Sequence, residues 1–259
     1  MARTSNGDVS LYYETAGSGP TVAFVGDVGY GAWQWGWQHA AVAGPYESLV
    51  ADLRGTGRSD APAGPYAVGD LVEDLTTVLS DAGVRSAHVV GAGLGGAVAL
   101  EAARTTSRVD SLFLLGTAAR GTGIDLEPLW GDPDDADALE RSLAAGLSAS
   151  FVDAREDAVA QMVEWRSAED ADRPAWEAQA AAVDGFDVSD RLYEITVPAL
   201  AVHGRDDAVW PPERGEKLAE GLPRGGFRPI ENAGHLVHVE ASKRVNDELL
   251  GFLADREDD

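Results

Sequence analysis

The sequence predicts an α/β protein with a mostly parallel, doubly wound sheet and a helical insertion. Short apolar runs alternate with segments of helical spacing, and one run leads directly into a glycine-dense turn at residues 91–96. Residues 118–191 interrupt this alternation with segments rich in Ala, Asp and Glu. Strands that alternate with helices form a parallel sheet through right-handed crossovers, which covers both faces of the sheet.

The first third of the chain supplies an edge strand and two buried strands. Residues 9–14 alternate in polarity, as an edge strand does. Residues 21–25 are a short apolar run, and residues 49–53 are expected to form a second buried strand. Continuous apolar runs are typical of strands buried on both faces of a parallel sheet. The first run ends in a glycine-rich loop, residues 26–31, whose backbone can approach a ligand closely.

The middle of the chain continues the alternation. Helical spacing of apolar residues predicts a helix over residues 68–82, which Gly83 would end. The following expected elements are a strand at 87–90, a helix at 97–104 and a strand at 111–115. After the insertion, we expect a strand at 197–202, a helix at 214–220, a strand at 227–230 and a closing helix at 242–254. The predicted core is therefore residues 1–117 and 192–259, with residues 118–191 as a helical cap over the carboxyl edge of the sheet.

The composition is strongly acidic. The 259 residues include 44 Asp and Glu against 20 Lys and Arg, for a formal charge of −24, and only Lys217 and Lys243 are lysines. Such self-repulsion is tolerated where salt screens it. We therefore expect a halophilic source, with an acidic surface for a basic partner as the alternative, and no nucleic-acid partner.

Several classes of site and location are also disfavoured. The absence of cysteine excludes disulfides and a thiol nucleophile, and no two histidines have a convincing ligand arrangement with a carboxylate, so we expect no metal and no cofactor. No run of 18 apolar residues exists and the first residues lack a hydrophobic signal region. These features predict a cytoplasmic protein without membrane contact, either monomer or dimer.

The glycine-dense turn is typical of a nucleophile elbow, in which a strand turns sharply into a helix. Gly91 and Gly95 stand at the two flanking positions where the pattern G-x-S-x-G needs residues without bulk. The central position, which carries the attacking hydroxyl in that pattern, is Gly93. The frame is present and the nucleophile is absent.

Two further polar segments follow predicted strands. Gly204, Asp207 and Pro211 lie after one strand, and Gly234 and His235 lie after the last. Ligands of open α/β folds bind at the carboxyl ends of the strands, so these residues and the elbow should meet at one edge.

With the elbow, and with Asp52-Leu53-Arg54-Gly55-Thr56-Gly57-Arg58-Ser59 after the second buried strand, the chain resembles the α/β-hydrolase superfamily over residues 9 to 254. The resemblance implies that Asp207 is the triad acid, His235 is the triad base, and the N–H groups of Val28 and Leu94 form the oxyanion hole. Asp206 is the rival acid, but the family's spacing favours Asp207. The loop at residues 26–29 is similar to that of the enol-lactone hydrolases of aromatic degradation.

The resemblance implies a hydrolase of small ester or lactone-type substrates, and Gly93 excludes a serine acyl-enzyme. Four interpretations remain. His235 and Asp207 could act as a general base dyad, which we favour; the protein could be a small-molecule binder or sensor; Gly93 could be an engineered replacement of serine; or the protein could be a hydrolase without present activity. If Gly93 is the one missing part, Gly93→Ser should create esterase activity.

The remaining predicted site residues are apolar. Trp33 near the oxyanion loop and Trp130 and Trp165 in the insertion are candidates for the substrate pocket. His238 is expected to be a packing residue.

Overall fold

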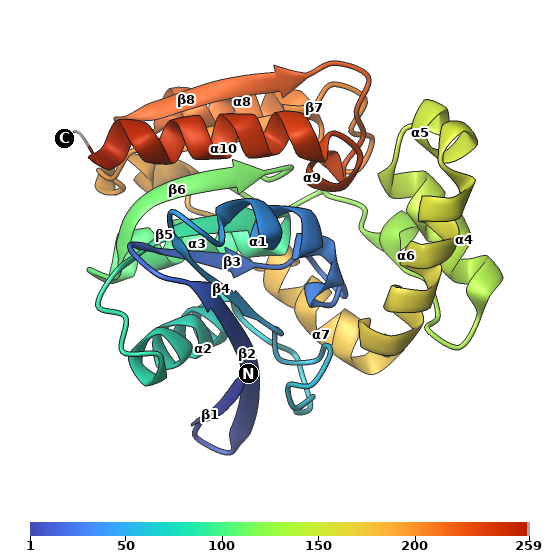
Figure 1. Cartoon of the computed structure of the whole chain (residues 1–259), viewed down its shortest axis with the longest axis horizontal. Coiled ribbons are helices and arrows are strands. Elements are labelled where there is room, and N and C mark those ends of the chain that lie inside the picture. Colours follow the sequence, from blue (N-terminus) through green and yellow to red (C-terminus); the bar gives the residue numbers. More distant parts are fainter. Residues whose placement is uncertain (258–259) are drawn as a thin grey trace.

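The computed structural model describes residues 1–257 and has a central sheet with helices on both faces (Figure 1). The described strands are β1 (Ala2–Asn6), β2 (Val9–Gly17), β3 (Thr21–Val25), β4 (Glu47–Ala51), β5 (Ala87–Ala92), β6 (Val109–Leu115), β7 (Ala199–Gly204) and β8 (Gly225–Ile230). They form one eight-stranded sheet in the order β1-β2-β4-β3-β5-β6-β7-β8. β2 is antiparallel to β1 and β4, and the neighbours from β4 to β8 are parallel. The predicted α/β, mostly parallel sheet is confirmed.

The described helices connect and extend these strands. They are α1 (Gly36–Val42), α2 (Val68–Asp81), α3 (Leu94–Thr105), α4 (Ala136–Gly146), α5 (Ala149–Ala154), α6 (Glu156–Glu169), α7 (Arg173–Asp184), α8 (Pro212–Gly221), α9 (Val237–Glu240) and α10 (Ser242–Glu257), with 3-10 turns η1 (Ala32–Trp35), η2 (Glu127–Leu129) and η3 (Ser189–Glu194). Among the described residues, no helix is long and apolar enough to cross a membrane.

Successive residues of the buried strands supply two separate cores. In β3, Ala23 and Val25 pack in one apolar cluster with α2 and α3, whereas Val22 and Phe24 pack in another with α10. Side chains of a strand point alternately to opposite faces, so a run that is apolar at every position needs a helix layer on each side. This is why the continuous apolar runs of the sequence become the centre of the sheet.

The chain between β6 and β7 contains α4, α5, α6 and α7, called here the inserted helices. They lie together beside the sheet in Figure 1. In the described part of the chain, the nearest approach to a strand within residues 118–191 is an isolated bridge between Arg120 and Asp187. The division into a core and a separate cap at residues 118 and 191 stays a prediction.

Two N-terminal features differ from what the sequence predicts. The chain begins with β1, which pairs with β2 at the sheet edge, although no strand is expected there. The tryptophan-rich segment after the loop at residues 26–31 forms η1 and α1. Both segments are short, and β1 alternates between exposed and half-buried residues without large apolar side chains, so neither has a clear period in the sequence.

Candidate functional site

The elbow has the compact geometry that its glycines predict. Gly93 joins β5 to α3 with φ 47° and ψ −109°, a region that favours glycine. A Cβ on Gly91 would overlap with the backbone of Gly95, and a Cβ on Gly95 would overlap with that of Val25. The elbow is therefore packed directly against the end of β3, where the next loop begins.

Asp207 and His235 meet at the carboxyl ends of β7 and β8, as the resemblance implies. His235 Nδ1 lies 3.0 Å from Asp207 Oδ2. Asp207 Oδ1 accepts hydrogen bonds from the N–H groups of Val209 and Trp210, at 2.9 and 2.8 Å. His203 Nε2 lies 3.1 Å from Asp207 Oδ2, so this carboxylate faces two imidazoles. These contacts fix the orientation of Asp207 against His235.

A third polar side chain, Asp27, completes the cluster. Asp27 follows β3, and its Oδ2 lies 2.7 Å from His235 Nε2. Its Oδ1 accepts hydrogen bonds from the N–H groups of Val28 and Leu94, at 2.7 and 2.8 Å. Val28 and Leu94 are the residues assigned to the oxyanion hole, so this pair of N–H groups is already occupied by a carboxylate of the chain itself.

Asp27 also occupies the space that a side chain at the elbow would need. A Cβ built on Gly93 would overlap with the Asp27 carboxyl group. Asp27 is not among the site residues that the sequence predicts. The available signal was an acidic residue inside an otherwise small and apolar loop directly after a buried strand.

The ionisation of His235 follows from its position between two acids. Burial acts to lower the pKa of His235, but the facing Asp207 and Asp27 outweigh burial and raise that pKa to about 10. Burial acts to raise the pKa of Asp207, but His235 and His203 hold it well below its usual range. At neutral pH, His235 is therefore an imidazolium that donates hydrogen bonds to carboxylates on both sides, and it cannot accept a proton in this state.

The inserted helices cover this cluster. Gln179 of α7 accepts a hydrogen bond from the N–H of Gly29 at 2.7 Å and donates to the carbonyl of Arg54 at 2.7 Å. The N–H of Leu236, next to His235, donates to the carbonyl of Gly146 at 2.8 Å. The exposed fraction of the side chain is 0% for Asp27 and Asp207 and 2% for His235. A substrate needs movement of these covering elements to reach the cluster.

The predicted pocket tryptophans occupy different places. Trp33 and Trp165 line a hollow of about 420 Å³ with Trp37 and Glu169, and Trp165 is 38% exposed. Trp130 packs against Trp176, with ring centroids 5.7 Å apart. Their role as substrate contacts stays a prediction.

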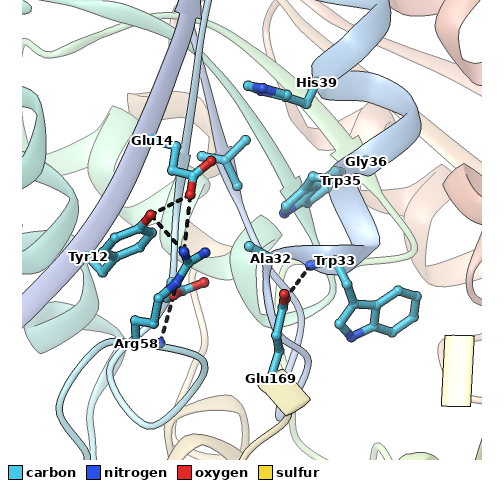
Figure 2. Close-up of a pocket in the computed structure, with 11 residues that line it drawn as sticks. Tyr12, Glu14, Ala32, Trp33, Trp35, Gly36, His39, Arg58 and Glu169 are labelled. Atoms are coloured by element: carbon cyan, nitrogen blue, oxygen red, sulfur yellow. Dashed lines mark hydrogen bonds and ion pairs between the residues drawn. The ribbon is translucent and has the colours of Figure 1, made fainter. Parts of the chain in front are cut away.

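Another pocket, of about 180 Å³, lies between β2, η1 and α1, and its lining does not include Asp27, Asp207 or His235. Figure 2 shows Arg58 between Tyr12 and Glu14, where its Nη1 lies 2.7 Å from the Tyr12 hydroxyl and 3.2 Å from Glu14 Oε1. The N–H of Trp33 donates to Glu169 on the opposite wall at 2.9 Å. Arg58 and Glu14 thus pair with each other, whereas Glu169 accepts a hydrogen bond from the backbone.

His238, near His235 in sequence, is a buried packing residue. Its ring lies 4.8 Å from that of Trp35, and neither ring nitrogen has a hydrogen-bond partner among the residues that the structure describes. Burial lowers the pKa of His238 to about 3, and the nearby charge of His235 acts in the same direction. Within residues 1–257, no group of three or more His, Asp or Glu side chains is arranged to hold a metal ion.

Comparison with known proteins places this geometry in context. Residues 29–242 match the family described as "alpha/beta hydrolase fold". Over 276 residues, the chain is 29% identical to "Putative carbamate hydrolase RutD" of Azorhizobium caulinodans, covering 98% of this chain and 99% of that protein. It is similar in structure to an enol-lactonase from Burkholderia xenovorans, with a TM-score of 0.85, 24% identity, and coverage of 98% and 100%, a likeness of fold alone. A solved structure described as Est816, an N-acyl homoserine lactone degrading enzyme, has a TM-score of 0.85 at 27% identity, with coverage of 97% and 100%.

Proposed function

Since the chain belongs to the alpha/beta hydrolase family, we propose that it is a hydrolase of small organic molecules in which Asp207 and His235 transfer protons and no serine takes part. The observation that carries this proposal is the continuous hydrogen-bonded series from Asp207 through His235 to Asp27, which ends on the N–H groups of Val28 and Leu94. The imidazole that would move a proton is present and oriented by Asp207, and the two N–H groups that would stabilise a developing oxyanion are held by Asp27 Oδ1.

The placement of the pair supports a chemical role. Asp207 holds Nδ1 of His235, so the other ring nitrogen, Nε2, points at the centre of the site. A buried imidazole oriented by a carboxylate, with its second nitrogen aimed at a nucleophile, is the arrangement that activates nucleophiles in many hydrolases.

The substrate class depends on the role of Asp27. The resemblance and the names of the relatives favour small esters and lactones, whose carbonyl oxygen is stabilised by the oxyanion-hole N–H groups during attack. In this structure Asp27 Oδ1 accepts both of these hydrogen bonds. An acyl substrate could use them only after Asp27 had moved away.

The test compares hydrolysis by the parent, His235→Gln and Asp207→Asn on a panel of small esters, lactones and alkyl halides. His238→Gln is the matched control, because it removes another buried imidazole that has no hydrogen-bond partner. We expect kcat/KM to fall at least about 100-fold in both His235→Gln and Asp207→Asn, in the range typical of general acid–base catalysis, and the control to keep its activity. Hydrolysis that is equally fast in parent and His235→Gln would contradict the proposal.

A second candidate, a small-molecule binder, is favoured by one observation. The side chains of the cluster are sealed from solvent and the oxyanion hole is filled from within. A ligand of a binder would raise the melting temperature without being consumed, because any ligand that binds the native state stabilises it. Such stabilisation, with no hydrolysis of the whole panel by folded protein, would replace the hydrolase proposal with this one.

A further inference from the structure

The Asp27 carboxyl group stands where the side chain of an elbow residue would be, between the oxyanion-hole N–H groups and His235. We propose that Asp27 is the nucleophile of this site and that its substrates are alkyl electrophiles, molecules with a saturated carbon that carries a halide or similar leaving group. The inference rests on the proposed hydrolase function and names the attacking atom and the bond that it breaks.

Asp27 takes the place of an elbow nucleophile in space, although it comes from the loop after β3 and not from the elbow. The carboxyl group overlaps with the space of a Cβ on Gly93, so the loop after β3 and the elbow cannot both supply a side chain there. Asp27 can enter the site because Gly93 has no side chain. The absence of a serine at position 93 therefore explains how the Asp27 carboxyl group fits there.

The two oxygens of Asp27 have different surroundings. Oδ1 is held by two backbone N–H groups, whereas the hydrogen-bond partner found for Oδ2 within residues 1–257 is His235 Nε2. The side chain is fully buried, so no hydration shell must be removed before attack. Oδ2 is therefore the oxygen with a free lone pair for a bond to carbon.

The occupied oxyanion hole distinguishes alkyl from acyl substrates. Attack by a carboxylate on an ester carbonyl would place the negative charge on a substrate oxygen, and the N–H groups of Val28 and Leu94 are already bonded to Oδ1. Attack on a saturated carbon creates no oxyanion on the substrate. It converts Asp27 into an ester whose carbonyl oxygen is Oδ1, which already lies between the two N–H groups.

The reaction then has two balanced steps. In the first, the lone pair of Asp27 Oδ2 forms a bond to carbon, and the bond from carbon to the leaving group breaks with its electron pair, releasing an anion. In the second, water adds to Cγ of Asp27, a proton of that water passes to His235 Nε2, and the negative charge develops on Oδ1. The bond between Cγ and the substrate-bearing oxygen breaks, and that oxygen takes the proton from His235 Nε2 and leaves as the alcohol. The proton of the resulting Asp27 carboxylic acid then passes to His235 Nε2, which restores the carboxylate and the imidazolium.

His235 changes its role between these steps for an electrostatic reason. Asp27 and Asp207 together raise the pKa of His235. Alkylation removes the charge of Asp27, which lowers the pKa of His235 and lets the imidazole lose its proton to solvent. The neutral ring, still oriented by Asp207, is then a base beside the ester that must be hydrolysed.

The inserted helices supply a donor suited to an anionic leaving group. Trp176 of α7 packs against Gly29 of the loop that carries Asp27, and its Nε1 would lie 3.1 Å from a Cβ on Gly29. This N–H is buried and has no hydrogen-bond partner in the described part of the chain. The Arg173 guanidinium lies 4.8 Å from the centre of the Trp176 ring and is paired with Glu127 and Glu177. A buried donor without an acceptor is costly unless a ligand uses it.

Mass spectrometry of the Asp27 peptide tests the inference directly. With 1-bromobutane, His235→Gln should accumulate one butyl group on Asp27, because attack proceeds and hydrolysis of the ester does not. The parent, turning over in water enriched in oxygen-18, should gain the label in the carboxyl group of Asp27, while the alcohol of the first turnover contains unlabelled oxygen. The control is Asp206→Asn, which changes the exposed acid next to Asp207 in the sequence and should behave as the parent does.

The alternative outcomes separate this inference from the proposed function. Two results would overturn the assignment of Asp27 as the nucleophile. One is bromide release with neither oxygen-18 nor an alkyl group on Asp27, and the other is no reaction of any alkyl halide with folded protein. Ester hydrolysis that requires His235 and becomes faster in Asp27→Ala would also overturn it, by assigning Asp27 a blocking role, while the hydrolase proposal stood. If the parent hydrolyses none of the substrates, or if its hydrolysis does not depend on His235, the proposed hydrolase function itself is wrong.

Discussion

Asp27 Oδ1 accepts a 2.8 Å hydrogen bond from the N–H of Leu94, so the carboxylate of the loop after β3 occupies an N–H group that is predicted to belong to an oxyanion hole. Together with the space that Gly93 leaves open, this contact changes the expectation that Gly93→Ser alone would restore an esterase. The serine would meet the Asp27 carboxyl group.

We therefore expect Gly93→Ser to be inactive on 4-nitrophenyl acetate and destabilised by about 1–3 kcal/mol, because it overpacks a buried site at a positive φ. Asp27→Ala plus Gly93→Ser should be more stable than Gly93→Ser alone and should hydrolyse the ester with a burst. Urea unfolding and stopped-flow absorbance provide the two measurements. High esterase activity in the single variant would show that Asp27 moves aside easily.

Nuclear magnetic resonance can measure the protonation of His235 with His238 as an internal reference. Because the pKa of His235 is raised to about 10 and that of His238 is lowered to about 3, the nitrogen-15 shifts at pH 7 should show one imidazolium and one neutral ring. In Asp27→Asn, the pKa of His235 should fall, since one of the two charges that raise it is gone. A neutral His235 in the parent at pH 7 would contradict an imidazolium held between Asp207 and Asp27.

The same group makes stability depend on alkaline pH. The pKa of His235 in the folded protein lies above the value of about 6.5 that it has in an unfolded chain, so its stabilising effect is complete below about pH 6.5 and is lost as pH rises through about 10. The difference in free energy of unfolding between parent and His235→Gln should therefore shrink across this interval. Urea melts at several pH values give the curve, and a difference that stays constant would argue against a raised pKa.

The inserted helices contain a buried ion pair whose loss should be costly. Arg166 Nε lies 2.6 Å from Asp170 Oδ2, and the two side chains are 2% and 3% exposed. Asp170 Oδ1 also accepts hydrogen bonds from the backbone N–H of Gly31 and from Trp33 Nε1. Arg166→Met should lower the free energy of unfolding by about 3–5 kcal/mol, because it leaves the Asp170 charge buried without compensation. The control is Arg173→Met, which removes partly exposed ion pairs of the same helices and should cost less than about 1 kcal/mol per pair. Equal effects would mean that Asp170 is protonated or reaches water.

The acidic composition predicts that folding depends on salt. With a formal charge of −24 and only two lysines, repulsion should destabilise the protein in dilute buffer and be screened near 1 M salt, where the Debye length is roughly 3 Å. Circular dichroism along a potassium chloride titration should show loss of structure well below 1 M. An unchanged melting temperature in low salt would rule out the halophilic interpretation.

Some parts of the fold were accessible from short stretches of sequence. β3 and β6 were predicted because each contains a run of apolar residues, at 22–25 and at 112–115, and α2 because its leucines and valines follow the helical period. β1 was missed because an edge strand with one partner needs no apolar pattern, and its residues alternate only between exposed and half-buried.

By itself, the sequence determined most of the alternation of strands and helices, the glycine-lined elbow, and the meeting of Asp207 with His235, because each depends on local patterns and on parallel strands ending at one edge of the sheet. Only the tertiary structure decided what fills the elbow. Asp27 and His235 lie 208 residues apart in the chain, and their contact depends on side-chain directions in loops from different strands. No periodicity or spacing encodes such a direction, since it arises only when the loops, the sheet edge and the inserted helices pack together.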